Sequence, residues 1–152
     1  MRNITLLVII TMIMSLGAKP SGAFKYYEYN SSTMREYPHE YYRLEYSGQE
    51  GAVLSWAKCN SEVVRVRVPE DAVRKVDSLI CSYKLYKLKK TYRPPFMVHD
   101  GIQWHVYFGY EQGSVSCIAD NAWPPEKLKE GIKAVNAYLD SLIKSAEEWK
   151  RL

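Results

Sequence analysis

Alternation of apolar and polar residues with a period of two is the feature that most restricts how this chain can fold. In residues 64–68, valines alternate with Arg65 and Arg67, and residues 42–46 and 102–108 alternate in the same way. Successive side chains of a strand point to opposite faces of a sheet. The pattern therefore predicts strands with one face covered by the core and the other, carrying the two arginines, in water.

Two further segments have apolar residues at helical spacing. The first runs from Ala72 to about Lys89, after a proline and two acids that suit the first turn of a helix. The second follows the Pro124–Pro125 pair, and its apolar stripe consists of Leu128, Ile132, Val135, Leu139, Leu142, Ile143, Ala146 and Trp149. The order of strands, helix, strands and helix predicts an α+β fold, with a mostly antiparallel sheet of about five to six strands and two helices packed on one face.

Short polar and glycine-containing segments divide the expected strands. Turns are expected at Asn30–Ser32, Ser47–Gly51 and Glu111–Gly113. Asp100–Gly101 fits a type I′ turn, because both of its residues tolerate positive φ angles. We therefore expect a hairpin in which residues 97–99 pair with the strand that begins at Ile102.

The N-terminus has the composition of a secretory signal peptide. Arg2 precedes an uncharged apolar run over residues 4–16, about 13 residues, which is shorter than the roughly 20 needed to span a bilayer. Ser21–Ala23 offers the best small-x-small cleavage site, so residues 1–23 are predicted to be the signal and residues 24–152 a single domain. Gly17 and Ala18 are alternative cleavage sites. The expected location is secreted or periplasmic, with no membrane span left after cleavage.

Charge and cysteine content narrow the classes of partner and scaffold. Removing residues 1–23 takes away Arg2 and Lys19 and no acid, which lowers the formal net charge from +4 to +2. So small a charge gives little attraction to phosphates, and nucleic acid is not an expected partner. Cysteines 59, 81 and 117 are odd in number, so at most one disulfide can form within the chain, and its pairing stays open.

Several motifs in the second half carry a family resemblance. Tyr92-x-Pro94 precedes Asp100-Gly101-x-x-Trp104, and Asn121-x-Trp123-Pro124-Pro125 leads into the long C-terminal helix. In this pattern the chain resembles small exported proteins of Bacteroides-like bacteria, commonly lipoproteins, whose function is unknown. The resemblance implies a bacterial envelope or secreted setting and carries over no catalytic residue. No cysteine precedes Cys59, so the chain lacks the lipid-acceptor thiol of those lipoproteins and is expected to be released as a soluble domain.

Tyrosine is concentrated between residues 24 and 46. Its ring is apolar and its hydroxyl polar, which suits both core packing and contact with sugars or proteins. Most of these rings are expected to fill the core and the edges of the sheet. The candidate ligand-binding residues are Tyr27, Tyr29, Tyr41 and Trp123, with Arg65 and Arg67 as an anion-facing pair.

No motif in the sequence identifies a catalytic centre, a cofactor or a metal site. Histidines 39, 99 and 105 do not stand at zinc-ligand spacing, and the expected burial of Cys117 separates it from the outward-facing His105. The leading hypothesis is an exported, non-catalytic domain that binds a protein or glycan of the cell envelope. The alternative is a small secreted hydrolase or transferase that uses surface carboxylates and His105.

Overall fold

The computed structural model describes residues 17–150, and the side chains of residues 17–146. Most of the predicted signal peptide, residues 1–16, lies outside the described residues. No helix in the described part of the chain is long and apolar enough to cross a membrane.

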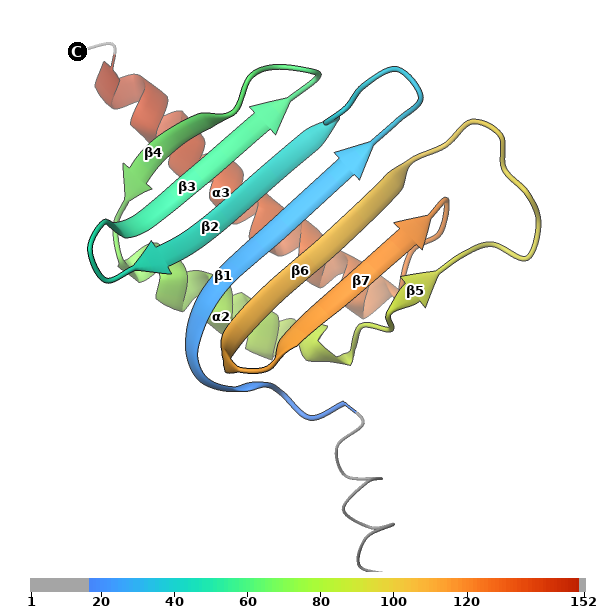
Figure 1. Cartoon of the computed structure of the whole chain (residues 1–152), viewed down its shortest axis with the longest axis horizontal. Helices are drawn as coiled ribbons and strands as arrows, with labels where there is room; N and C mark the ends of the chain where they lie inside the picture. The colour runs from blue at the N-terminus through green and yellow to red at the C-terminus, as the bar shows by residue number, and fades with distance from the viewer. Residues whose placement is uncertain (1–16, 151–152) are drawn as a thin grey trace, which may run out of the picture.

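One sheet of seven strands forms the framework, in the order β4-β3-β2-β1-β6-β7-β5. Its strands are β1 (Ser21–Ser32), β2 (Glu40–Ser47), β3 (Gly51–Lys58), β4 (Val64–Val68), β5 (Thr91–Tyr92), β6 (Gln103–Gln112) and β7 (Ser114–Asp120). Neighbouring strands are antiparallel, except that β5 runs parallel to β7. Helices α2 (Asp71–Tyr83) and α3 (Glu126–Lys150) lie behind this sheet in Figure 1. The predicted α+β class is confirmed, with a sheet slightly larger than expected.

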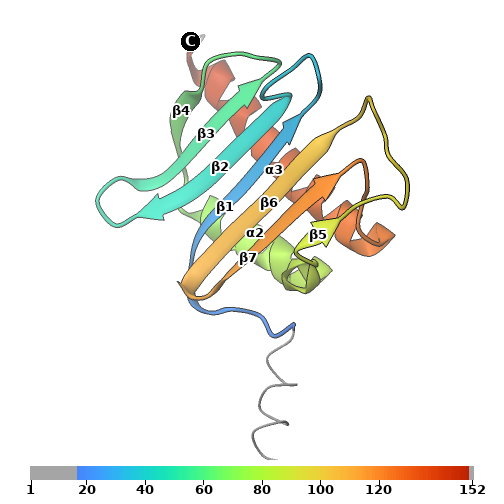
Figure 2. The same cartoon turned by 45° about the vertical axis from the view of Figure 1, so that its right-hand side comes forward.

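Both helices cover the same face of the sheet, and Figure 2 shows the opposite face uncovered. Alternate side chains of the central strands are buried beneath the helices, namely Tyr27, Tyr29, Tyr42, Leu44, Leu54, Trp104, Val106, Phe108, Cys117 and Ala119. The period-two pattern of the sequence therefore assigns the faces correctly. The valines of β4 are less well covered than expected, and Val64 is 37% exposed, because β4 is an edge strand.

The first helix ends sooner than its apolar spacing predicts. Lys84 adopts a left-handed conformation, φ 57° and ψ 42°, and its amide donates to the carbonyl of Cys81. A single 3₁₀ turn, Leu85–Lys87, follows. The prediction of a helix to about Lys89 is wrong because the chain bends at Lys84, which lets Leu85 and Leu88 enter the core after the helix has ended.

The hairpin predicted at Asp100–Gly101 does not form. Residues 93–102 are a connection without strands, and β6 begins at Gln103. Both edges of β6 are already paired, with β1 on one side and β7 on the other, so no edge is left for residues 97–99. The turn predicted at Asn30–Ser32 is also wrong, because β1 continues to Ser32, which pairs with Gln103 of β6.

The segment just before the tyrosine-rich region is part of the sheet. Ser21 pairs with Gln112 of β6, and the amide of Ala23 donates to a carboxylate oxygen of Glu111 at 3.2 Å. Ahead of them, the Lys19 ammonium lies 3.4 Å from a carboxylate oxygen of Asp77 and 4.9 Å from the ring centre of Tyr110. The predicted cleavage site after Ala23 therefore falls inside β1.

Candidate functional site

The face of the sheet that no helix covers, here called the open face, carries side chains in three rows across the strands. Read from β7 towards β4, the first row consists of Ile118, His105, Asn30, Tyr41 and Ala57. The second row consists of Ser116, Tyr107, Glu28, Arg43, Ser55 and Arg65. The third row consists of Ser114, Gly109, Tyr26, Glu45, Val53 and Arg67. Three of the predicted binding residues, Tyr41, Arg65 and Arg67, thus lie on one surface.

Flat side chains form a continuous strip near the middle of the open face. The rings of Tyr26 and Tyr107 have centres 5.1 Å apart, and the imidazole of His105 stacks on Tyr107 at 6.1 Å with an interplanar angle of 17°. The guanidinium of Arg43 lies 5.5 Å from the ring centre of Tyr26. We call these four residues the aromatic strip. Gly109 makes room for it, because a Cβ there would lie 2.6 Å from a ring atom of Tyr26.

Most charges around the strip are already paired with one another. Arg43 donates to Glu28 at 2.6 Å and to Glu45 at 2.9 Å. Arg65 lies 3.7 Å from Glu45 and 3.5 Å from Glu50. These partly exposed ion pairs add little to stability. Their effect is to leave the surface rich in hydrogen-bonding groups without a strong excess of either charge.

The two tyrosines of the strip differ in acidity. Partial burial is the main cause that raises the pKa of Tyr26. Hydrogen bonding from Tyr26 is the main cause that lowers the pKa of Tyr107.

The other predicted binding residues lie on the covered side of the sheet. Tyr29 and Trp123 line a pocket of about 330 Å³ between the sheet and α3, together with His39, Tyr42, Asn136 and Asp140. Tyr27 is fully buried, and its hydroxyl donates to Asn136 Oδ1 at 2.9 Å. The six residues grouped by the sequence are thus divided between two surfaces and the core.

His105 and Cys117 lie on opposite faces, as the sequence predicts. The Nε2 of His105 is 3.2 Å from the hydroxyl oxygen of Ser116 on the open face. Cys117 is fully buried beneath the helices, and this burial raises the pKa of its thiol to about 12. These two residues cannot form a nucleophile and base pair.

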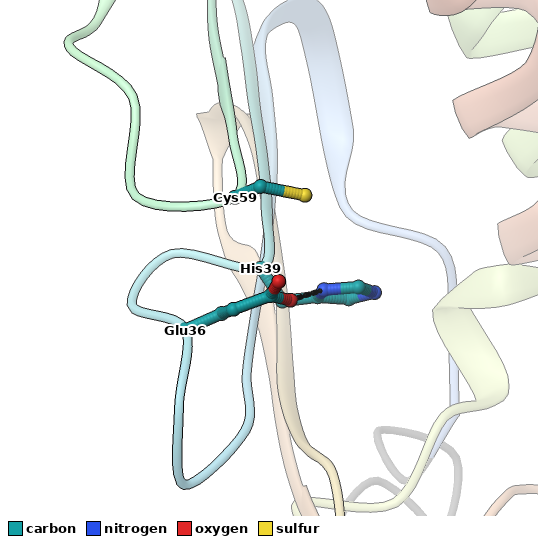
Figure 3. Close-up of side chains that lie close together, drawn as sticks. All are labelled: Glu36, His39 and Cys59. Carbon is teal, nitrogen blue, oxygen red and sulfur yellow. Dashed lines mark hydrogen bonds and ion pairs between the residues drawn. The ribbon is translucent and has the colours of Figure 1, made fainter.

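A cluster that the sequence analysis missed joins the β1–β2 connection to the end of β3. Oxygen, nitrogen and sulfur atoms of Glu36, His39 and Cys59 all lie within 4.8 Å of one another. Figure 3 shows the carboxylate of Glu36 against the imidazole of His39, with the thiol of Cys59 close by. A signal was present: the turn predicted at Ser47–Gly51 joins the two strands that pair Glu40 with Lys58, which places His39 beside Cys59.

No family model matches this chain, and no curated protein is significantly similar to it in sequence. The resemblance to exported Bacteroides-like proteins stays a prediction.

Proposed function

We propose that this chain is an exported, non-catalytic domain whose open face binds an uncharged glycan of the cell envelope. The observation that carries the proposal is the aromatic strip on the uncovered face of the sheet. Rings of tyrosine and histidine offer apolar surface against which a sugar ring can pack, and their hydroxyl and imidazole groups can exchange hydrogen bonds with its hydroxyls. The paired arginines and glutamates around the strip supply further donors and acceptors.

The charge pattern favours a neutral glycan over a charged partner. Arg43 and Arg65 are each held by two carboxylates, so neither is free to attract an anion without first losing those contacts. A polyhydroxylated molecule can accept and donate hydrogen bonds without breaking the ion pairs. An envelope protein is the competing occupant of this surface. The hydrolase alternative would use surface carboxylates with His105, but the Nε2 of His105 contacts the hydroxyl of Ser116 at 3.2 Å rather than a carboxylate.

A glycan array with the purified protein, followed by calorimetry on the ligands found, tests the proposal. Tyr107→Ala is expected to weaken glycan affinity about 10-fold, which corresponds to the roughly 1.4 kcal/mol within reach of one aromatic contact. Tyr37→Ala is the matched control, because Tyr37 is 75% exposed and lies outside the open face. An array without ligands would refute the proposal. Capture of an envelope protein that is lost in Tyr107→Ala would assign the open face to a protein partner instead.

Export itself has a separate test, and the sheet constrains its outcome. Cleavage after Ala23 would remove three residues of β1 and the ion pair of Lys19. We therefore expect the mature chain to begin at Ala18 or Lys19, the products of the alternative sites. Mass spectrometry of the protein recovered from a bacterial envelope or medium measures this directly. A mature chain that still begins at Met1 would refute export, and one beginning at Phe24 would show that the fold tolerates loss of the first residues of β1.

A further inference from the structure

We propose that Glu36, His39 and Cys59 form a binding site for a zinc ion at the end of the sheet, separate from the open face. A carboxylate oxygen, an imidazole nitrogen and a thiol sulfur meet there within 4.8 Å. The three belong to two different connections, which only the fold brings together. Figure 3 shows the imidazole and the thiol pointing to the same side, with the carboxylate reaching across to the imidazole.

The donor set fits zinc better than other common ions. Zinc bonds to sulfur at about 2.3 Å and to imidazole nitrogen or carboxylate oxygen at about 2.0–2.2 Å. Binding of the ion therefore requires the Glu36 carboxylate and the His39 imidazole, which are hydrogen-bonded to each other, to separate, and the Cys59 thiol to turn towards the ion. All three side chains are exposed or half-buried. Calcium and magnesium prefer oxygen ligands throughout, and the carboxylate disfavours copper(I). On binding, the thiol proton of Cys59 is released to solvent and the thiolate bonds to the ion.

Backbone hydrogen bonds hold the two connections together. The amide of Cys59 donates to the carbonyl of His39 at 3.0 Å, and the amide of Asn60 donates to the carbonyl of Pro38 at 3.0 Å. The Asn60 side chain completes the link, because its Oδ1 accepts from the amide of Tyr37 at 2.5 Å and its Nδ2 donates to the carbonyl of Arg35 at 3.2 Å. The backbone of all three ligands is thus fixed before an ion arrives.

Three protein ligands leave the fourth position of a tetrahedral zinc ion for water or another molecule. His39 also lines the pocket between the sheet and α3, with Tyr29 and Trp123. Of the three ligands, the pocket lining includes His39, so a small anionic or hydroxylated molecule bound in the pocket could reach the open coordination position. This makes the site one for an exchangeable ligand as well as for the metal.

The test uses the purified full chain under a non-thiol reductant, with zinc and, as a spectroscopic substitute, cobalt(II). We expect one zinc ion per chain by equilibrium dialysis and a thiolate-to-cobalt charge-transfer band in the near ultraviolet. Cys59→Ser should abolish the band and weaken zinc binding by at least about 10-fold, the loss that even an outer-shell change typically causes. Glu36→Gln and His39→Asn should each weaken zinc binding by a similar factor.

Matched controls separate this site from adventitious binding. Cys81→Ser, His99→Asn and Glu62→Gln change the same residue types elsewhere and should leave zinc affinity within about two-fold of the unchanged protein. Thermal unfolding of each variant without metal shows whether it is folded. The proposal is overturned if the unchanged protein takes up no zinc, or if folded Cys59→Ser binds zinc as tightly and keeps the charge-transfer band. It is also overturned if the control variants lose as much affinity as the ligand variants.

Discussion

The two faces of the sheet use the same residue type in opposite ways. On the covered face, Tyr42 and Tyr110 are buried under the helices, and their hydroxyls donate to Asp140 at 2.9 Å and Asp77 at 2.5 Å. On the open face, Tyr26 and Tyr107 are half-buried and contact mainly each other and their neighbours on the sheet. Successive residues of one strand supply both sets, because side chains alternate between the faces.

This difference shows that the tyrosine content of the chain has two separate causes. A buried tyrosine must find a partner for its hydroxyl, and the helices provide one in Asn136, Asp140 or Asp77. An open-face tyrosine has water as a partner and is under no such demand. We therefore expect substitutions on the covered face to change stability and those on the open face to change binding.

Adjacent residues of β6 give the largest contrast. Phe108 is fully buried, so Phe108→Ala should lower the free energy of unfolding by about 3–5 kcal/mol. Tyr107→Ala, one position earlier and on the other face, should lower it by less than about 1 kcal/mol while weakening glycan binding. Urea unfolding of both variants measures the difference. Similar losses of stability would mean that the open face is not a free surface.

Alkaline pH should lower the free energy of unfolding, because the tyrosines on the covered face are buried and resist ionisation. Burial raises the pKa of Tyr29 to about 12 and raises those of Tyr27, Tyr42 and Tyr110 as well. The folded state therefore keeps protons that the unfolded chain loses, so stability is complete below the unfolded pKa near 10 and falls as pH rises from there to 12. The ionisation of Tyr29 alone should lower the free energy of unfolding by about 2 kcal/mol at pH 12.

Urea midpoints at several pH values between 8 and 11 check this dependence. The conservative variant Tyr29→Phe keeps the ring without the titrating hydroxyl, so its stability should fall less steeply with pH. Midpoints that stay constant across this range would contradict the assignment of these tyrosines to the core.

The same glycine substitution should act differently on the two sides of the sheet. A Cβ at Gly131 of α3 would lie 2.5 Å from Tyr83 Cβ and 2.8 Å from Leu85 Cδ2. The overpacking costs about 1–3 kcal/mol and offsets the gain of about 1 kcal/mol in helix propensity, so Gly131→Ala should be destabilising by about 1 kcal/mol. Gly109→Ala meets only the outer ring atoms of Tyr26, which can swing away, so it should weaken glycan binding more than stability.

Differential scanning calorimetry and glycan titration of these two variants give both readouts. The comparison fails if Gly109→Ala lowers the melting temperature as much as Gly131→Ala does. It also fails if Gly109→Ala leaves glycan affinity unchanged.

Chemical labelling of the cysteines compares an exposed thiol with one in the core and requires no substitution. Cys59 is exposed, whereas Cys117 is buried with a thiol pKa of about 12. A maleimide at neutral pH should modify Cys59 quickly in the native protein and Cys117 only after unfolding, with Cys81 between the two. Mass spectrometry of timed samples measures the order, and bound zinc should slow the modification of Cys59. Rapid labelling of Cys117 in the folded protein would place it outside the core.

Local pattern was sufficient for the parts of the fold that depend on neighbouring residues. Alternation places Arg65 on the open face and Val106 in the core, and the pair Pro124–Pro125 marks the start of α3. The errors arise where distant segments compete. Asp100–Gly101 has the residues of a hairpin turn, yet β1 and β7 already occupy both edges of β6. The sequence named Tyr41, Arg65 and Arg67 of the open face as binding residues and His105 as outward-facing, but it did not group Glu36, His39 and Cys59.

The sequence by itself determined most of the longer strands, the positions of the two helices and the faces to which the residues of those strands point, because these follow from side-chain geometry over a few residues. Only the tertiary structure decided the strand order, the inclusion of Ser21–Ala23 in β1 and the surfaces that result. Tyr26 meets Tyr107 because β1 lies between β2 and β6, and His39 meets Cys59 because β2 pairs with β3. Such contacts depend on which strands become neighbours, and that choice is made by packing of the whole core.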